Sequence, residues 1–201
     1  MHGDWPILRA VSGGTRTAPP PSPDWTGLRG AARPLLVRRL GPPDLPAVER
    51  HLLALGPEDR RRRFLSRLGD AAIVAHARRL DPLRGILFGA LDGPEGELLG
   101  IAEAHPAAEP GRVEVAVSVH PPHRGRGLGR CLAARAVAAA FAAGAETAEF
   151  CFDPENRAVV RLIASLGGRF GPGLGQAVVR RDDGTGLPPR PEHRAATLHD
   201  Y

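Results

Sequence analysis

The stretch from residue 112 to residue 144 has the clearest pattern of hydrophobic and polar positions. Residues 112–119, RVEVAVSV, carry valine at every second position, with Glu114, Ala116 and Ser118 between them. This period of two predicts a β-strand with one buried face. After HPPHRGRGLG, an alanine-rich run has apolar residues at helical spacing as far as Gly144, which predicts a helix ended by glycine. The stretch therefore predicts a strand, a glycine-rich loop and a helix in succession.

The same two periods divide the rest of the chain into elements. The pattern predicts strands at 34–40, 86–91, 97–104, 146–152 and 176–181, and helices at 45–55, from 57 onward, 70–80 and 157–166. Residues 92–96, DGPEG, have the composition of a hairpin turn. We expect one α/β (α+β) domain over 34–181. The Gly- and Pro-rich ends, 1–33 and 182–201, are expected to be a flexible arm and tail.

Composition limits the classes of protein to consider. The 201 residues are 42% hydrophobic, enough for one domain with a core. Two cysteines without CxxC spacing indicate neither a metal site nor a disulfide framework. Cys131 and Cys151 are interpreted as packing residues. No apolar run approaches the roughly 20 residues of a membrane span, and the start does not have the pattern of a secretory leader. These features favour a cytoplasmic protein without membrane contact.

The chain has a net charge of +5, and arginine supplies the positive charge because the chain has no lysine. Such a charge suits an anionic partner. Nucleic acid is one alternative, but aromatic residues make up only 4% of the chain, so stacking platforms for bases are scarce. The run at 60–63 is interpreted as a solvated helix face rather than a nucleic-acid contact.

A strand followed by a glycine-rich loop and a helix can hold a phosphate, because the first N–H groups of a helix lack partners and its dipole favours anions. The loop matches neither the Rossmann nor the Walker spacing. It reads R-x-x-G-x-G from Arg124 to Gly129, directly after the strand. This resembles the coenzyme-A loop of the GNAT superfamily of N-acyltransferases.

The resemblance extends over about 34–181. Residues 55–64, LGPEDRRRRF, and 113–119, VEVAVSV, are similar to segments of the bacterial Pat-type protein-lysine acetyltransferases. It implies a mixed, mostly antiparallel sheet of six to seven strands flanked by four to five helices. It also implies acetyl-CoA as cofactor and an amine acceptor, either a small molecule or a protein lysine. A monomer or a homodimer would be compatible with it.

The resemblance also implies which residues bind the cofactor. The expected residues lie on the end of the strand, in the loop and at the start of the helix that follows 146–152. They are Val117, Ser118, Val119, Arg124, Gly125, Arg126, Gly127, Leu128, Gly129, Arg130 and Asn156.

Glu114 is the candidate general base. An acceptor amine arrives as an ammonium ion, and a carboxylate beside the loop can take its proton directly or through water. Glu103, His105 and His123 are weaker candidates. The tyrosine that many members of the superfamily use as a general acid is expected near position 163, which is Ile163 here. Because Tyr201 is the only tyrosine of the chain, no general acid is assigned.

Two alternatives to the enzyme stay open. The missing tyrosine is compatible with a coenzyme-A-binding sensor that does not catalyse transfer, and turnover of acetyl-CoA by an amine would separate this sensor from an enzyme. The arginines are compatible with a nucleic-acid-binding protein, whose affinity would fall steeply with salt.

Overall fold

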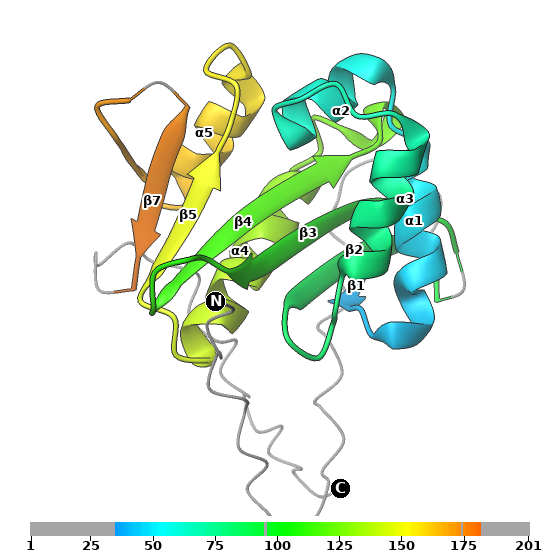
Figure 1. The fold of residues 1–201 in the computed structure, drawn as a ribbon, viewed down its shortest axis with the longest axis horizontal. Helices are drawn as coiled ribbons and strands as arrows, with labels where there is room; N and C mark the ends of the chain where they lie inside the picture. Colours follow the sequence, from blue (N-terminus) through cyan, green and yellow to red (C-terminus); the bar gives the residue numbers. More distant parts are fainter. Residues whose placement is uncertain (1–34, 95, 174, 182–201) are drawn as a thin grey trace, which may run out of the picture.

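The computed structural model describes residues 35–94, 96–173 and 175–181 (Figure 1). The expected arm at 1–33 and tail at 182–201 lie outside the described residues. The elements, in chain order, are β1 (Leu35–Arg39), η1 (Pro42–Asp44), α1 (Leu45–Leu53), α2 (Pro57–Phe64), α3 (Asp70–Arg79), β2 (Ile86–Asp92), β3 (Leu98–Pro106), β4 (Arg112–Val119), η2 (Pro121–His123), α4 (Leu128–Ala142), β5 (Thr147–Cys151), α5 (Arg157–Ser165), β6 (Arg169–Phe170) and β7 (Gln176–Arg180).

The seven strands form one sheet in the order β1-β2-β3-β4-β5-β7-β6. Every neighbouring pair is antiparallel except β4 and β5, which are parallel and joined through α4. This confirms the expected mixed, mostly antiparallel sheet of six to seven strands. The predicted elements all occur, with ends that differ by at most two residues. The two-residue strand β6 was missed because it is too short to show any alternation.

The sheet has a hydrophobic core on each face. On one face, α4 and α5 pack Leu132, Val137 and Ile163 against the valines of β4. On the other face, α1 and α3 cover β2 and β3, with Val48 and Ile73 fully buried. The alternation along 112–119 therefore corresponds to one buried face, and Glu114 on the opposite face is exposed. In the described part of the chain, no helix is long and apolar enough to cross a membrane.

The strands β4 and β5 pair over a short distance only. Their register joins Arg112 to Thr147, Val113 to Ala148 and Glu114 to Glu149. β4 continues to Val119, still paired with β3, without a partner on its β5 side. The two strands therefore make a fork that opens at Glu114 and Glu149, and α2 lies near the open end of β4 (Figure 1).

Candidate functional site

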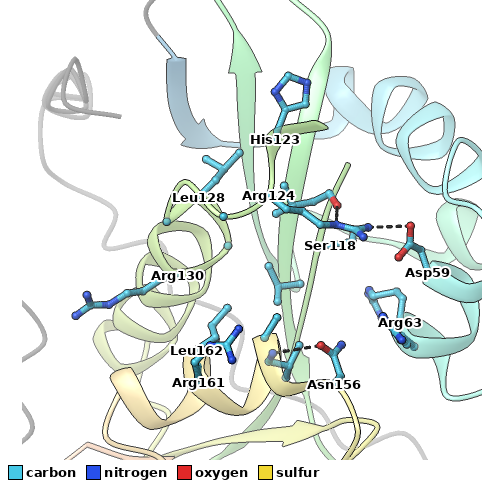
Figure 2. A pocket seen from close by; sticks show the side chains of 18 of the residues that line it. Asp59, Arg63, Ser118, His123, Arg124, Leu128, Arg130, Asn156, Arg161 and Leu162 are labelled. Atoms are coloured by element: carbon cyan, nitrogen blue, oxygen red, sulfur yellow. Dashed lines mark hydrogen bonds and ion pairs between the residues drawn. The ribbon is translucent and has the colours of Figure 1, made fainter. Parts of the chain in front are cut away.

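A pocket of about 480 Å³ lies where β4 has no partner strand (Figure 2). Its walls come from α2, the end of β4, the glycine-rich loop, the start of α4 and one side of α5. The described lining residues are Leu55, Asp59, Arg62, Arg63, Val117, Ser118, Val119, His123, Arg124, Gly125, Gly127, Leu128, Gly129, Arg130, Asn156, Ala158, Val159, Arg161, Leu162 and Ser165.

The structure brings the residues expected to bind a cofactor together around this pocket. All eleven except Arg126 line it. Asn156 caps the N-terminus of α5, and its side chain accepts a hydrogen bond of 3.4 Å from the N–H of Val159. Their individual contacts with a cofactor remain a prediction.

The loop has a backbone that glycine permits. Gly125 and Gly127 have φ of +74° and +82°, the left-handed region that side chains disfavour. Nothing lies within 4 Å of the place where a Cβ would stand on either glycine. Gly127 caps α4 without a side chain, so the first-turn N–H groups ahead of Cys131 face this open space. A pyrophosphate fits such a cradle, because its oxygens can accept from these groups.

The backbone of β4 supplies a second set of polar groups. The N–H of His120 donates to the carbonyl of Leu99 on β3 at 2.9 Å. Because successive residues of a strand direct their backbone groups to alternate sides, Val117 and Val119 direct theirs toward the fork. The carbonyl of Val119 accepts from Nε of Arg124 at 2.8 Å. The remaining groups can bind an extended ligand chain along β4.

A buried histidine supports the same strand from behind. His51 is 2% exposed, and its Nδ1 lies 3.0 Å from the carbonyl of Leu98 while its Nε2 lies 2.9 Å from Oγ of Ser118. A carbonyl can only accept, so Nδ1 carries the proton and Nε2 accepts from the hydroxyl. Burial, and then the stacked ring of His120, lower the pKa of His51 to about 4. The neutral imidazole orients the Ser118 side chain at the pocket wall.

Arginine side chains of α2 join this helix to other elements of the fold. Arg60 donates to the carbonyls of Leu53 and Leu55 at the end of α1, and Arg61 pairs with Asp153 after β5 at 2.5 Å. Asp59 on the same helix pairs with Arg124 of the loop at 2.8 Å, as Figure 2 shows. The interpretation of the run as a solvated face was wrong for Arg60, Arg61 and Arg63, because each contacts a different element of the fold.

A buried charge cluster lies behind the pocket. Glu103 on β3 is fully buried, and its Oε1 lies 2.7 Å from Nη2 of Arg63. His76 and His105 each place Nε2 3.3 Å from its Oε2. Burial alone would raise the pKa of Glu103, but Arg63 and the two histidines outweigh it and hold this pKa well below the usual range. Because Nε of Arg63 and Oε1 of Glu103 have no aligned hydrogen-bond partner in the described residues, we treat this pair as mainly electrostatic. The sequence pattern indicated Glu103 and His105 only weakly, and nothing in it connected them to Arg63.

Glu114 lies at the fork rather than in the pocket wall. It is exposed, with His105 opposite it on β3 and Glu149 opposite it on β5, all on the same face of the sheet. Arg112 bonds Glu149, whereas Glu114 has no ion-pair partner among the residues that the structure describes. The side chain is therefore open to solvent and to an approaching ligand.

Three other expectations can be compared with the structure. Ile163 is fully buried in the core, so the position counted for a tyrosine does not face the pocket. The described residues that line the pocket include no tyrosine. Cys131 packs against the core as expected, but the interpretation of Cys151 was wrong. It is exposed at the end of β5, on the face that no helix of the described part of the chain covers there.

Comparisons with known proteins agree with this architecture. The chain is similar to the GNAT domain of S. lividans PAT, with 20% identity and a TM-score of 0.59 over 73% of this chain and 90% of that one. It is similar to yncA from Salmonella typhimurium, a putative acetyltransferase solved with acetyl-CoA, with 22% identity and a TM-score of 0.55 over 74% and 95%. A cAMP-binding acyltransferase from Mycobacterium smegmatis shares 20% identity and a TM-score of 0.55 over 80% of this chain, which spans 48% of that protein. These likenesses show the fold.

The sequence comparisons identify the family. No curated protein sequence matches the chain. The model of the acetyltransferase (GNAT) family matches residues 49–167, more than half of the chain, including α2, the fork, the glycine-rich loop and α5. The chain therefore belongs to the acetyltransferase (GNAT) family, whose cofactor is acetyl-CoA.

Proposed function

We propose that this protein is an acetyl-CoA-dependent N-acetyltransferase in which an acceptor amine attacks the thioester directly. The observation that carries the proposal is the fork. β4 loses its β5 partner after Glu114, and the pocket begins three residues beyond Glu114 on the same strand, at Val117. A ligand lying along β4 would therefore point its reactive end toward the exposed carboxylate.

The chain's own residues would hold the cofactor in two ways. The first-turn N–H groups of α4, behind Gly125 and Gly127, bind the pyrophosphate. The backbone of Val117 and Val119 binds the extended arm as an added strand would be bound. When bound, acetyl-CoA supplies an acetyl group activated as a thioester. Holding that group against the acceptor lowers the entropy cost of the reaction.

Glu114 is proposed as the general base. An ammonium ion has no free electron pair, so it must lose a proton before it attacks. Glu114 takes this proton, directly or through one water molecule, and releases it to solvent. The amine would then form a C–N bond as the thioester C–S bond breaks, and coenzyme A would leave as a thiolate that solvent protonates. Its exposed position, with no ion-pair partner among the described residues, supports the proposal because the carboxylate is free to receive a cation.

The acceptor is proposed to be a protein lysine. No helix of the described residues covers the face of the sheet around Glu114, Glu149 and Cys151 (Figure 1). A side chain that projects from another protein can reach this face. The likeness of residues 55–64 and 113–119 to the Pat-type enzymes supports the same class of acceptor. A small amine is the alternative within the same chemistry.

Binding and turnover test the proposal separately. Acetyl-CoA at about 100 times its Kd is expected to stabilise the folded protein by roughly 2.7 kcal/mol. Glu114→Gln should keep this stabilisation while lowering the rate of acetyl transfer to a lysine peptide by about 10²–10⁴. Glu109→Gln, which alters an exposed carboxylate in the β3–β4 connection, is the control and should leave both unchanged.

Three results would contradict parts of the proposal. Absence of any thermal shift at millimolar acetyl-CoA would remove the function altogether. Binding without turnover by peptides or amines would favour a coenzyme-A sensor. A Glu114→Gln variant that keeps more than about a third of the parent rate would show that Glu114 is not the general base. The reaction would then depend on the proximity of the amine to the thioester.

A further inference from the structure

Asp59 is the only carboxylate among the described residues that line the pocket, which also carries five guanidinium groups. Those guanidinium groups belong to Arg62, Arg63, Arg124, Arg130 and Arg161. A pocket for an anionic ligand gains nothing from an acid on its wall, because like charges repel. Asp59 therefore needs a physical explanation.

The partner of Asp59 is the arginine that begins the glycine-rich loop. Arg124 donates through Nε to the carbonyl of Val119, and its Nη2 lies 2.8 Å from Oδ2 of Asp59 (Figure 2). Both side chains are partly accessible, Asp59 at 19% and Arg124 at 44%. The loop's first arginine is thus already paired with an anion, on the side of the pocket where α2 lies.

The helix that carries Asp59 is held mainly by charges. No apolar residue of α2 is fully buried, although Phe64 packs partly against the core. Besides Asp59, the helix is joined to β3 by Arg63, to the end of β5 by Arg61, and to α1 and α3 by Arg60. Among the partners of these α2 side chains, only Arg124 belongs to the glycine-rich loop. A phosphate bound at the loop can therefore replace the contact between Asp59 and Arg124 but none of the others.

We propose that the Asp59 carboxylate is the counter-ion of Arg124 before the cofactor binds. On binding, the cofactor's pyrophosphate replaces this carboxylate as the partner of Arg124. This inference rests on the proposed function. In the exchange the Arg124 guanidinium turns a donor from the Asp59 carboxylate to a phosphate oxygen, and no covalent bond changes. Asp59 is then a positioning residue. It holds α2 against the glycine-rich loop, and part of the cofactor's affinity is used to release that contact.

The exchange and a purely structural role of Asp59 predict opposite effects of Asp59→Asn on cofactor binding. If Asp59 only fixed Arg124 for the phosphate, Asp59→Asn would weaken binding. If the two anions compete, removing the carboxylate charge should tighten coenzyme-A binding by about threefold to tenfold at low salt. Raising the salt concentration toward 1 M should reduce this gain, because the Debye length shortens to about 3 Å.

Calorimetric titration of the full chain with coenzyme A and with inorganic pyrophosphate tests the inference. The parent protein is compared with Asp59→Asn and with Asp70→Asn, a matched control that removes an exposed carboxylate paired with Arg60 of the same helix and outside the pocket wall. Asp59→Asn should tighten both ligands, and Asp70→Asn should change neither by more than about twofold. Thermal melting without ligand verifies that each variant folds.

A double substitution identifies the group that is exchanged. In an Arg124→Gln background, Asp59→Asn should have less than half of its original effect on the Kd, because no guanidinium is left to change partner. If Asp59→Asn changes the Kd equally in both backgrounds, the exchange is overturned. Simple repulsion between Asp59 and the anionic ligand then explains the effect. Unchanged or weakened binding in Asp59→Asn would overturn the inference with the proposed function intact, whereas a parent protein that binds no coenzyme A would overturn the proposed function itself.

Discussion

Nη2 of Arg63 on α2 lies 2.7 Å from Oε1 of Glu103 in the middle of β3, and both side chains are at least nine-tenths buried. The pair joins the helix that walls the pocket to the central strands of the sheet. A buried ion pair contributes little net stability, but the loss of one partner leaves an isolated charge in a medium that solvates it poorly. The pocket wall therefore depends on both residues.

Glu103→Gln is expected to lower the free energy of unfolding by about 3–5 kcal/mol, because it leaves the Arg63 guanidinium without a counter-charge. Urea denaturation measures the effect. Asp70→Asn removes the partner of Arg60 on the same helix, but Asp70 is 75% exposed, and the cost should stay within about 1 kcal/mol. Equal effects of the two substitutions would mean that Glu103 is solvated in the folded protein.

His51 predicts a pH dependence of stability. Burial lowers its pKa to about 4 in the folded protein, whereas an unfolded histidine titrates near 6.5. As the pH falls from about 6.5 to 4, the unfolded state takes up a proton that the folded state does not, so stability falls. The loss at pH 4 should be on the order of 3 kcal/mol, and above pH 6.5 this residue should contribute no slope.

Denaturation at several pH values between 7.5 and 4 measures this loss, with His51→Gln as the comparison. Subtracting the curve of the variant removes the contributions that parent and variant share. A difference between parent and variant that does not change with pH would show that His51 is not held neutral.

Gly127→Val tests the loop. The substitution is strained because φ is +82°, and the new side chain would occupy the space in which the first-turn N–H groups meet a phosphate. Binding of acetyl-CoA should be lost while the fold persists. Isothermal titration measures the affinity, and circular dichroism reports the fold.

Gly93→Val is the matched control for this prediction. Gly93 has φ of +86° and equally open surroundings, but it lies in the turn between β2 and β3, away from the pocket wall. Its substitution should cost similar backbone strain and leave acetyl-CoA binding intact. Loss of binding in both variants would indicate unfolding rather than a blocked cradle.

Much of the fold could be predicted from local sequence. The alternation of 112–119, the glycines of 125–129 and the apolar spacing of the helices each reflect a short-range period, and each predicted element occurs. Ten of the eleven expected cofactor-binding residues line one pocket. Nine of these ten lie in one segment, 117–130, whose strand, loop and helix the local pattern predicts. That they bind a cofactor remains a prediction.

The sequence by itself determined the order of the elements, the glycine-rich loop and the polarity of each strand face. Only the tertiary structure decided which charges meet. Asp59 meets Arg124, Arg63 meets Glu103, and His51 meets Ser118, and these partners are between 40 and 67 residues apart in the chain. Periodicity extends over one element at a time, so it cannot predict such pairs. They form because the sheet order brings α1 and α2 over β3 and β4, where a buried or half-buried polar group must find its partner in another element.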